Sequence, residues 1–447
     1  MVTELSSFIF DGYEEKFQDG RVSFFYVLHH DGEVFHFTET IHVQPIVLTT
    51  EQREKIRPIL DCLLLMLGIS YWKLYCAKNI AIKPFSLSKQ EADFWNTIYT
   101  KGLGEFYFKN NIDFRHLINF PFEEKVSHTS PSIFALKNRV LVQLGGGKDS
   151  IVSAELLKIY NKDFSLFVLN EEEVHKNVAG VIGKEVINVK RVIDVKLFEL
   201  NMRSDIFNGH VPISAIYAFV GLLTSALYEY SYIITSNEES ANYGNVFYRG
   251  EEINHQWSKS YEFEQLFQKY MNDYIATNIQ YFSLLRPIRE LKIVQLFTQY
   301  KQYFQKFSSC NTNFRIRHGS DTLLWCGSCP KCAFVFLSLS AFLPKNEVVK
   351  IFGKNLFSDG RLLSLFRELT GLLGFKPFEC VGTPEESQYA LYLVMKRGEY
   401  TDDEIVKQLS HELTFDQDTV MSLERNLSNV SEIHNIPREF GAVLQNI

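Results

Sequence analysis

Residues 139–150 read Arg-Val-Leu-Val-Gln-Leu-Gly-Gly-Gly-Lys-Asp-Ser, an apolar run that ends in three glycines and a short polar turn. The apolar run predicts a buried β-strand over 139–144, and the pattern from Ser150 to Tyr160 is typical of a helix. Glycine lets a backbone approach phosphate oxygens closely, and a helix start directs free N–H groups and the positive end of its dipole toward an anion. The stretch therefore predicts a phosphate-binding loop between a strand and a helix, formed by Gly145, Gly146, Gly147, Lys148 and Ser150.

Asp149 is the residue of this loop that a phosphate group would repel. Its carboxylate suits either the cap of the following helix or a share in holding Mg²⁺. The loop also lacks the Gly-Lys-Ser/Thr ending and the longer spacer of a Walker sequence. A glycine-rich turn without any ligand is the alternative interpretation.

Apolar strands alternate with helices through residues 131–340, on both sides of this loop. Further strands are expected at 164–169, 192–200 and 232–235, and a long apolar helix within 205–229 precedes the last of them. Such alternation implies a parallel sheet that is covered on both faces and binds ligands at the carboxyl ends of its strands. This region is therefore predicted to be an α/β catalytic domain.

The two flanking regions show other patterns. Residues 1–130 are predicted to form an N-terminal α+β unit, and residues 341–447 a helical C-terminal segment. The expected elements of the first unit are antiparallel strands at 21–28 and 33–38 and a helix that begins after a capping signal at Thr49. His128 to Ser132 is the expected linker to the parallel-sheet core.

The composition is that of an ordinary globular protein and argues against several classes of function. The formal net charge is −7 and no basic stripe occurs, which argues against a nucleic-acid partner. The N-terminus lacks the basic start and apolar stretch of a signal peptide, and segment 205–229 has too many polar residues for a good spanning helix. We therefore expect a cytoplasmic protein without membrane contact, and no protein partner is evident.

Four of the seven cysteines lie close together in the sequence, at Cys310, Cys326, Cys329 and Cys332. Four thiolates with short spacings suit a closed tetrahedral zinc site, which would be structural because no coordination position is left for a substrate. The wide gap after Cys310 fits this interpretation less well than the tight Cys-x-x-Cys-x-x-Cys run does. Reduced buried thiols, or catalytic or redox-active cysteines, are the alternatives.

The loop from Gly145 to Ser150 resembles the Ser-Gly-Gly-x-Asp-Ser loop of the N-type ATP pyrophosphatases, with Gly145 in place of the leading serine. This resemblance implies an α/β core of the PP-loop, HUP-like type and ATP as cofactor. It also implies cleavage of ATP between the α and β phosphates and transfer of AMP to an oxygen of the substrate.

Six later runs narrow the resemblance. They are Ser236-Asn-Glu-Glu-Ser-Ala-Asn-Tyr-Gly-Asn245, Asn254-His-Gln-Trp-Ser-Lys-Ser260, Ser283-Leu-Leu-Arg-Pro-Ile288, Phe307-Ser-Ser-Cys310, Trp325-Cys-Gly-Ser-Cys-Pro-Lys-Cys332 and Lys376-Pro-Phe-Glu-Cys-Val-Gly382. Together they resemble the UDP-N-acetylmuramoyl-L-alanyl-L-glutamate epimerases of bacterial peptidoglycan synthesis. The resemblance implies that the terminal L-glutamate of a nucleotide-sugar peptide is inverted to D-glutamate, with ATP, Mg²⁺ and a carboxyl-adenylate.

Candidate site residues lie within these runs. Glu238 and Glu239 follow an expected strand, where their carboxylate oxygens could bind Mg²⁺ or simply face solvent or cap a helix. His255 and Lys259 are spaced i, i+4, so on a helix they would share one face as a base and a phosphate clamp. A surface or structural histidine is the alternative.

Inversion at carbon also needs a donor and an acceptor on opposite faces. His255 and Lys259 would serve one face, and Cys380 or Glu239 the other; a packed structural cysteine is the alternative for Cys380. Arg286, before Pro287, is the preferred cofactor-binding arginine. The other arginines that could bind carboxylates or a diphosphate are Arg289, Arg315 and Arg317.

Three other functions stay open at this point. The first is an amidating or nitrile-forming enzyme of the same superfamily, which would require ammonia. The second is a tRNA-modifying enzyme, against which the acidic balance counts. The third is a non-catalytic nucleotide-sensing module.

Overall fold

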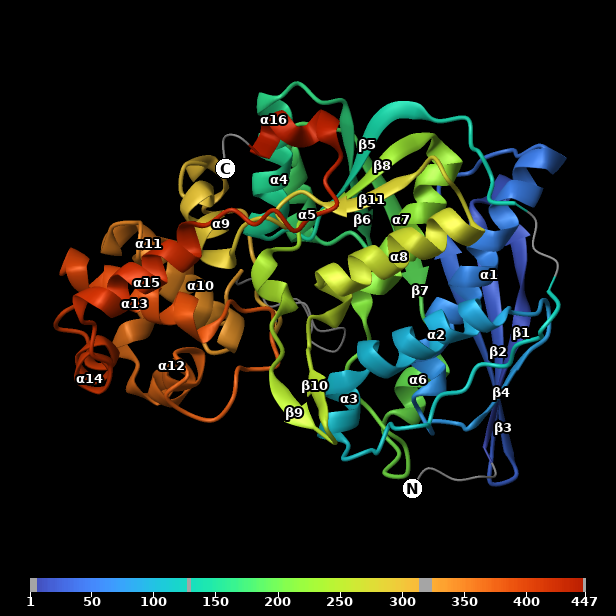
Figure 1. The fold of residues 1–447 in the computed structure, drawn as a ribbon, viewed down its shortest axis with the longest axis horizontal. Helices are drawn as coiled ribbons and strands as arrows, with labels where there is room; N and C mark the ends of the chain where they lie inside the picture. Colours follow the sequence, from blue (N-terminus) through green and yellow to red (C-terminus); the bar gives the residue numbers. More distant parts are fainter. Residues whose placement is uncertain (1–5, 127–129, 313–323, 445–447) are drawn as a thin grey trace.

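The computed structural model describes residues 6–126, 130–312 and 324–444. The first two ranges share one sheet of nine strands (Figure 1). The strand order is β11-β8-β5-β6-β7-β3-β2-β1-β4. The strands are β1 (Ser7–Lys16), β2 (Arg21–His30), β3 (Glu33–His42), β4 (Asn79–Ile82), β5 (Lys137–Gln143), β6 (Phe164–Leu169), β7 (Val186–Val192), β8 (Tyr230–Thr235) and β11 (Gln280–Ser283). A separate ribbon consists of β9 (Val246–Tyr248) and β10 (Glu251–Ile253).

The helices fall into three groups along the chain. The first group is α1 (Thr50–Trp72), α2 (Lys89–Gly102) and α3 (Gly104–Lys109). The second is α4 (Lys148–Ile159), α5 (Glu173–Ile182), α6 (Val195–Leu200), α7 (Ile213–Tyr228), α8 (Tyr261–Tyr274) and α9 (Glu290–Phe297). The third is α10 (Pro330–Ser340), α11 (Lys345–Phe352), α12 (Leu363–Leu369), α13 (Pro384–Arg397), α14 (Glu404–Glu412), α15 (Gln417–Ser428) and α16 (Gly441–Leu444).

Strands β11, β8, β5, β6 and β7 run parallel to one another. Successive side chains of β5 enter different cores: Leu141 packs in the core that includes α1 and α7, whereas Val140 and Val142 pack in the core that includes α4 and α9. Because both faces of this half of the sheet are buried, its strands are almost continuously apolar. The prediction of an α/β fold with a parallel sheet covered on both faces is confirmed.

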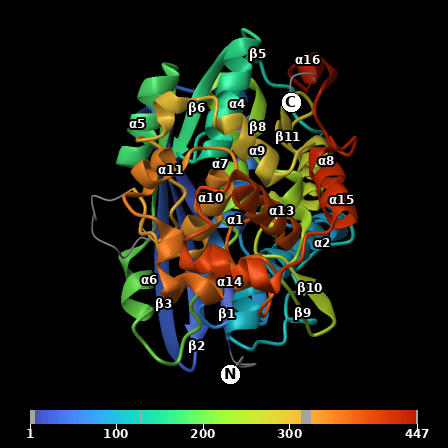
Figure 2. The same cartoon turned by 90° about the vertical axis from the view of Figure 1, so that its left-hand side faces the viewer.

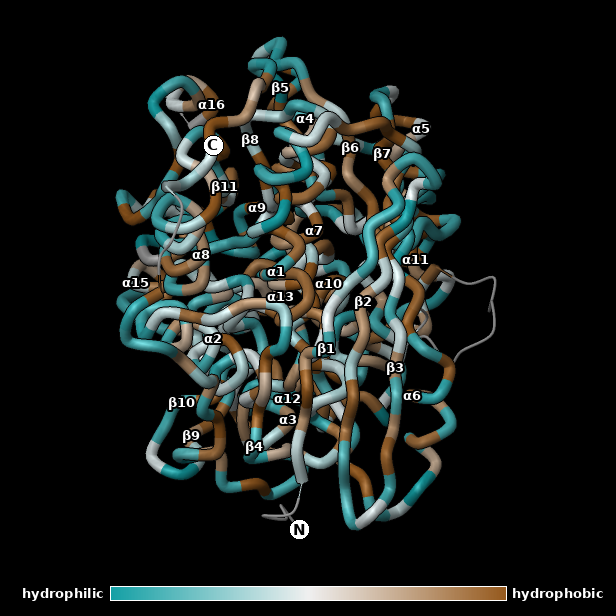
Figure 3. The backbone as a smooth tube through the Cα atoms, turned by 90° about the vertical axis from the view of Figure 1, so that its right-hand side faces the viewer, coloured by the Kyte–Doolittle hydropathy of each residue, from teal (hydrophilic) through white to brown (hydrophobic). Residues whose placement is uncertain are grey.

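Strands β1 to β3 form an antiparallel meander that joins the parallel half where β3 pairs with β7. The antiparallel strands expected at 21–28 and 33–38 are therefore confirmed, and one sheet runs from the N-terminal part into the parallel half. The capping signal is confirmed too, since the side chain of Thr49 accepts a hydrogen bond from the N–H of Gln52 at the start of α1. Figure 3 shows α1 as largely hydrophobic, and it packs against β1, β2 and α7. The division at residue 130 stays a prediction.

The strand predicted at 192–200 is wrong. The chain leaves β7 at Val192, and α6 begins after Asp194, whose side chain accepts a hydrogen bond from the N–H of Lys196. Asp194 thus interrupts the apolar run and caps the helix that follows it, so the residues after Asp194 are helical. The long apolar helix expected before β8 is present as α7.

The C-terminal segment is helical, as predicted; α10 to α15 lie together at the left of Figure 1 and face the viewer in Figure 2, whereas α16 lies at the top of both views. Within the three described ranges, no helix combines the length and the hydropathy needed to cross a membrane. Residues 128 and 129 of the expected linker, and Arg315 and Arg317, lie outside the described residues.

Candidate active site

A cavity of about 480 Å³ opens at the carboxyl ends of the parallel strands. The side chains that end β5, β6 and β8 line it, and so does Arg191 near the end of β7. These lining residues are Gln143, Leu169 and Thr235. Parallel sheets bind ligands at this edge, so the position of the cavity agrees with the sequence prediction.

The glycine loop forms one wall of the cavity. Gly145, Gly147, Asp149 and Ser150 line it, while the backbone of Gly146 turns through a positive φ of 73°. Gly147 is the N-cap of α4, and a Cβ added there would lie 2.7 Å from the hydroxyl of Ser309. Only glycine leaves the space that this turn requires, and the first N–H groups of α4 have no partner within the helix.

Two buried polar groups face the cavity without a hydrogen-bond partner among the described residues. They are the amide nitrogen of Gln143 and the hydroxyl of Ser309, and both residues line the cavity. An unpaired buried donor costs free energy, so a ligand that accepts hydrogen bonds would be stabilised here. Phosphate oxygens beside the glycine loop have the required chemistry.

Lys148 does not line the cavity, contrary to what the loop predicted. Its side chain is fully buried, and its ammonium donates to Glu290 Oε1 over 2.7 Å and also contacts Asp149. Burial alone would raise the pKa of Glu290, but the charges of Lys148 and Lys331 lower it to about 2. Asp149 lies in the first turn of α4 and Gly147 is its cap, so the capping role considered for Asp149 is wrong.

Cys380 is a second centre of charge in the cavity wall. Lys259 donates to its sulfur over 3.2 Å, and His255 hydrogen-bonds the same thiol. Burial would raise the pKa of Cys380, but the charge of Lys259 and the hydrogen bond from His255 lower it to about 5. Cys380 is therefore a thiolate at neutral pH, the form that can accept a proton.

The helix expected to carry His255 and Lys259 is absent. His255 lies in the loop after β10, and Lys259 ends a short 3₁₀ turn, Trp257–Lys259. The backbone N–H of His255 donates to Asn245 Oδ1 over 2.8 Å, which holds this loop without helical bonds. Since both side chains contact Cys380, the three form one cluster, and the expectation that Cys380 serves the opposite face from the other two is wrong.

The two expected magnesium ligands lie in different surroundings. Glu238 is buried, and burial together with the charge of Glu290 raises its pKa to about 7. Glu239 instead pairs with Arg289 over 2.7 Å, and neither carboxylate is among the residues that line the cavity. Glu238 is thus the better placed of the two for a cation, because a buried carboxylate without a full countercharge favours one.

Arg286 acts within the protein framework. Its guanidinium bonds Glu264 over 3.0 Å and the backbone carbonyls of Glu238 and Lys259 over 2.8 and 2.6 Å. These contacts differ from the expected cofactor binding, since Arg286 does not line the cavity. It ties the turn of Glu238 to that of Lys259.

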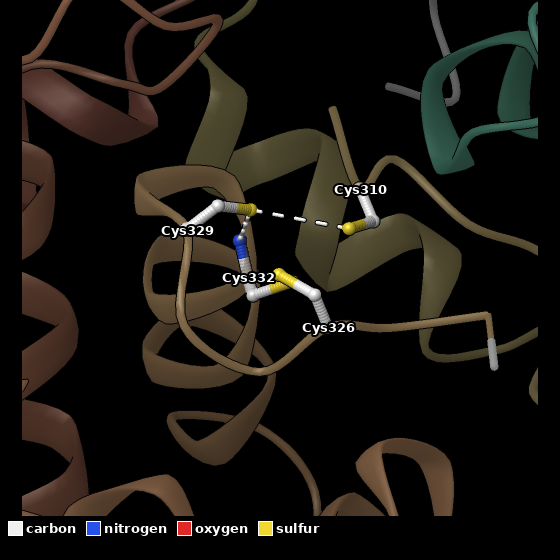
Figure 4. Close-up of side chains that lie close together, drawn as sticks. All are labelled: Cys310, Cys326, Cys329 and Cys332. Atoms are coloured by element: carbon white, nitrogen blue, oxygen red, sulfur yellow. Dashed lines mark hydrogen bonds between the residues drawn. The ribbon is translucent and has the colours of Figure 1, made fainter. Parts of the chain in front are cut away.

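The four clustered cysteines come together in space (Figure 4). Their sulfur atoms all lie within 4.8 Å of one another, with Cys310 and Cys329 4.0 Å apart and Cys326 and Cys332 3.7 Å apart. Four sulfurs bound tetrahedrally at about 2.3 Å from zinc would be about 3.8 Å apart. The arrangement is therefore compatible with one structural zinc ion, and the long gap after Cys310 is no obstacle.

Several residues of the site were not singled out in the sequence. Lys331 stands between two clustered cysteines, pairs with Glu290 over 3.2 Å and contacts the carbonyl of Cys380. Glu105 reaches His255 from the N-terminal part of the chain. An isolated acidic residue in the otherwise apolar run from Gly104 to Phe108 was the only sequence signal for Glu105.

Fold and site together define an α/β protein with a glycine-loop cavity at the carboxyl edge of its sheet and, in the cavity wall, a cysteine whose pKa is lowered by cationic neighbours. The chain belongs to the MurL family: the family model described as the MurL N-terminal domain matches residues 1–284, and that of the MurL C-terminal domain matches residues 306–423.

Three curated relatives are each named UDP-N-acetyl-alpha-D-muramoyl-L-alanyl-L-glutamate epimerase. The protein from Xanthomonas oryzae pv. oryzae is 37% identical over 84% of this chain and 83% of its own length. Those from a Micromonospora species and from Salinispora tropica are each 35% identical over 91% of this chain, and over 90% and 88% of their own lengths. The family resemblance read from the six sequence runs is thus confirmed.

Proposed function

We propose that this protein is an ATP- and Mg²⁺-dependent isomerase that epimerises the terminal L-glutamate of UDP-N-acetyl-α-D-muramoyl-L-alanyl-L-glutamate. The observation that carries the proposal is the identity of 35–37% to enzymes of that name over 84–91% of the chain. The nucleotide-linked peptide and ATP are both cytoplasmic compounds, so we propose that the reaction takes place in the cytoplasm. The proposal includes no nucleic acid, membrane or protein partner.

The proposed chemistry explains why an epimerase would consume ATP. Removing the α-proton beside a carboxylate places a second negative charge next to the first. A carboxylate oxygen of the substrate therefore attacks the α-phosphorus of ATP, pyrophosphate leaves, and the resulting acyl-adenylate has no charge on its carbonyl. The α-proton can then be removed and returned on the opposite face. Water finally cleaves the adenylate to give the D-glutamyl product and AMP.

The glycine loop is the proposed phosphate site. The N–H groups at the start of α4, with Ser150 and Ser309, would donate to phosphate oxygens. Magnesium would neutralise the phosphate charge, and Asp149 and Glu238 offer the carboxylate oxygens that it prefers. Two observations support this placement: Gln143 and Ser309, which line the cavity, each have a buried polar atom without a hydrogen-bond partner among the described residues, and burial raises the pKa of Glu238.

The thiolate of Cys380 is the proposed base on one face of the α-carbon. Lys259 and His255 keep it deprotonated and can stabilise negative charge that develops nearby. Glu239 is not part of this group, because its carboxylate pairs with Arg289. The four clustered cysteines are proposed to hold a structural zinc ion.

Turnover of the L-glutamyl precursor with ATP and Mg²⁺, followed by chiral analysis of glutamate, tests the function directly. We expect D-glutamate to form only when ATP is present, and phosphorus NMR to show AMP and pyrophosphate. ADP with orthophosphate would contradict the adenylation step, and an amide or nitrile formed with ammonia would favour the amidating alternative. Ser150→Ala should lower turnover by about 10²-fold or more, as losses of positioned donors do.

Solvent deuterium tests the order of the steps. If adenylation acidifies the α-proton, the D product formed in D₂O should carry deuterium at the α-carbon, and exchange should require ATP. Exchange that is equally fast without ATP would show that adenylation plays no part in removing this proton. Cys380→Ala should abolish exchange on the face that the thiolate serves.

A further inference from the structure

A buried carboxylate from the N-terminal part of the chain lies against the cluster around Cys380. Glu105 is in the first turn of α3, and only 6% of its side chain is exposed. The preceding residue lets α3 pack directly on β10, because a Cβ on Gly104 would lie 3.2 Å from Ile253. Since β10 leads into the loop of His255, this close approach places Glu105 beside the imidazole.

The ring of His255 connects Glu105 to Cys380. Its Nδ1 lies 2.5 Å from Glu105 Oε2, and the same ring hydrogen-bonds the thiol of Cys380. Asn245 fixes the backbone on both sides of this contact: it accepts from the N–H of His255 and donates to the carbonyl of Pro377 over 2.8 Å. Asn245 thus fixes the backbone at His255, and Glu105 fixes the direction of the His255 ring.

The charges along this chain of contacts alternate. Burial would raise the pKa of Glu105, but the hydrogen bond and charge of His255 lower it to about 2. Burial would lower the pKa of His255, but its hydrogen bonds to Cys380 and Glu105 raise it to about 9. At neutral pH the order is therefore carboxylate, imidazolium, thiolate. His210, 3.4 Å from Glu105, stays neutral because burial lowers its pKa to about 3.

We propose that Glu105 is a positioning residue, which holds His255 as an imidazolium directed at the sulfur of Cys380. The N-terminal part of the chain thereby completes the reactive cluster. This inference deepens the proposed function, since Cys380 is the base proposed there. It can nevertheless be tested on the free protein, so that its failure and the failure of the epimerase assignment are distinguishable.

The test follows the ring of His255 by ¹⁵N NMR of histidine-labelled protein over a range of pH. The titratable and charged groups that face this ring are Glu105, Lys109, His210, Lys259, Glu379 and Cys380. The His255 signals are assigned by their loss in His255→Gln. In the unaltered protein both ring nitrogens should be protonated at pH 7, with a midpoint near 9.

Glu105→Gln keeps the size of the side chain and removes its charge. The midpoint of His255 should fall by about one unit or more, because an opposite charge in hydrogen-bond contact typically shifts a pKa by 1–3 units. Cys380→Ala should also lower it, since the thiolate stabilises the imidazolium from the other side. Glu105→Asp should retain most of the midpoint. Asp113→Asn, an exposed carboxyl paired with Arg115 beyond α3, is the matched control and should change nothing.

Three results would overturn the proposal. One is a folded Glu105→Gln variant, or a Cys380→Ala variant, with an unchanged midpoint. Another is one equivalent of metal that the unaltered protein holds and Glu105→Gln loses, because one possible ligand atom from each of Glu105, His210 and His255 lies within 4.8 Å of the other two. The third is a neutral ring of His255 at pH 7 in the unaltered protein. This result would contradict the proposal even if Glu105→Gln fails to fold.

Discussion

The cysteine cluster and the cluster around Cys380 use sulfur in opposite ways, although Lys331, which lies between Cys329 and Cys332 in the sequence, contacts the carbonyl of Cys380. The clustered cysteines face one another, with Cys310, Cys329 and Cys332 buried. Cys380 faces an ammonium and an imidazolium instead. Thiols gathered with thiols suit a shared metal, whereas a thiol between cations becomes a thiolate available for proton transfer. Neighbours, more than burial, set the chemistry of each sulfur.

Disruption of the proposed zinc site should have the largest effect. Cys326→Ser is expected to lower zinc content from near one equivalent to near zero and Tm by at least about 5 °C, because structural zinc contributes directly to folding. Elemental analysis and calorimetry of protein purified without added zinc would measure both. Ser328→Ala, which removes only a donor to Cys326, is the control and should retain the metal. A metal-free protein of unchanged stability would show that the four clustered cysteines hold no structural metal, and the contrast with the cluster around Cys380 would then be wrong.

Loss of the single thiol should stop turnover and leave the fold intact. Cys380→Ala is expected to lower kcat by about 10²–10⁴-fold, the usual contribution of a general acid or base. Zinc content and Tm should stay close to those of the unaltered protein. Parallel chiral assays and calorimetry check this. A variant that loses zinc or stability along with activity would show that the two clusters are one structural unit.

The pH profile follows from the same charges. The pKa of Cys380 is lowered to about 5, so the thiolate is lost as pH falls through that value. The pKa of His255 is raised to about 9, so the imidazolium is lost as pH rises through it. With saturating Mg²⁺, which keeps the Glu238 carboxylate ionised although burial raises its pKa, we expect kcat/KM to be level between these limits and to fall about tenfold per unit beyond each. A profile that declines already between pH 6 and 8 would contradict this assignment of charges.

Lys331 tests how far the clusters are coupled, with the smallest expected effect. Its ammonium contacts Glu290 and the carbonyl of Cys380, while its backbone lies between Cys329 and Cys332. Lys331→Met should lower kcat/KM by about tenfold, as the loss of one buried charge contact typically does, without loss of zinc. Exposed Lys306→Met is a suitable control. Zinc loss in Lys331→Met would mean that the side chain also supports the metal site.

The sequence-based predictions were most accurate for structural features that lie within short stretches of the chain. The strand, glycine loop and α4 lie within residues 139–160, and three of the four clustered cysteines lie within seven residues, so local patterns were sufficient. Glu105 and His255 are 150 positions apart, and the packing of α3 on β10 brings them together. Lys148 and Arg286 were misjudged for a similar reason, since their partners Glu290 and Glu264 come from distant helices. A sequence motif identifies which residue type occupies a position. The direction of a charged side chain depends instead on the ion-pair partner of that side chain.

The pairing of β3 with β7 has a consequence for dissecting this protein. A fragment that began at residue 130 would leave β7 with a row of unpaired N–H and C=O groups along one side. It would also remove Glu39 of β3, the ion-pair partner of the buried guanidinium of Arg191 over 2.6 Å. Exposed strand edges recruit other chains, so the open edge of β7 would favour self-association of this fragment. The meander thus covers the edge of the parallel half of the sheet, and its removal should give an insoluble, self-associating fragment.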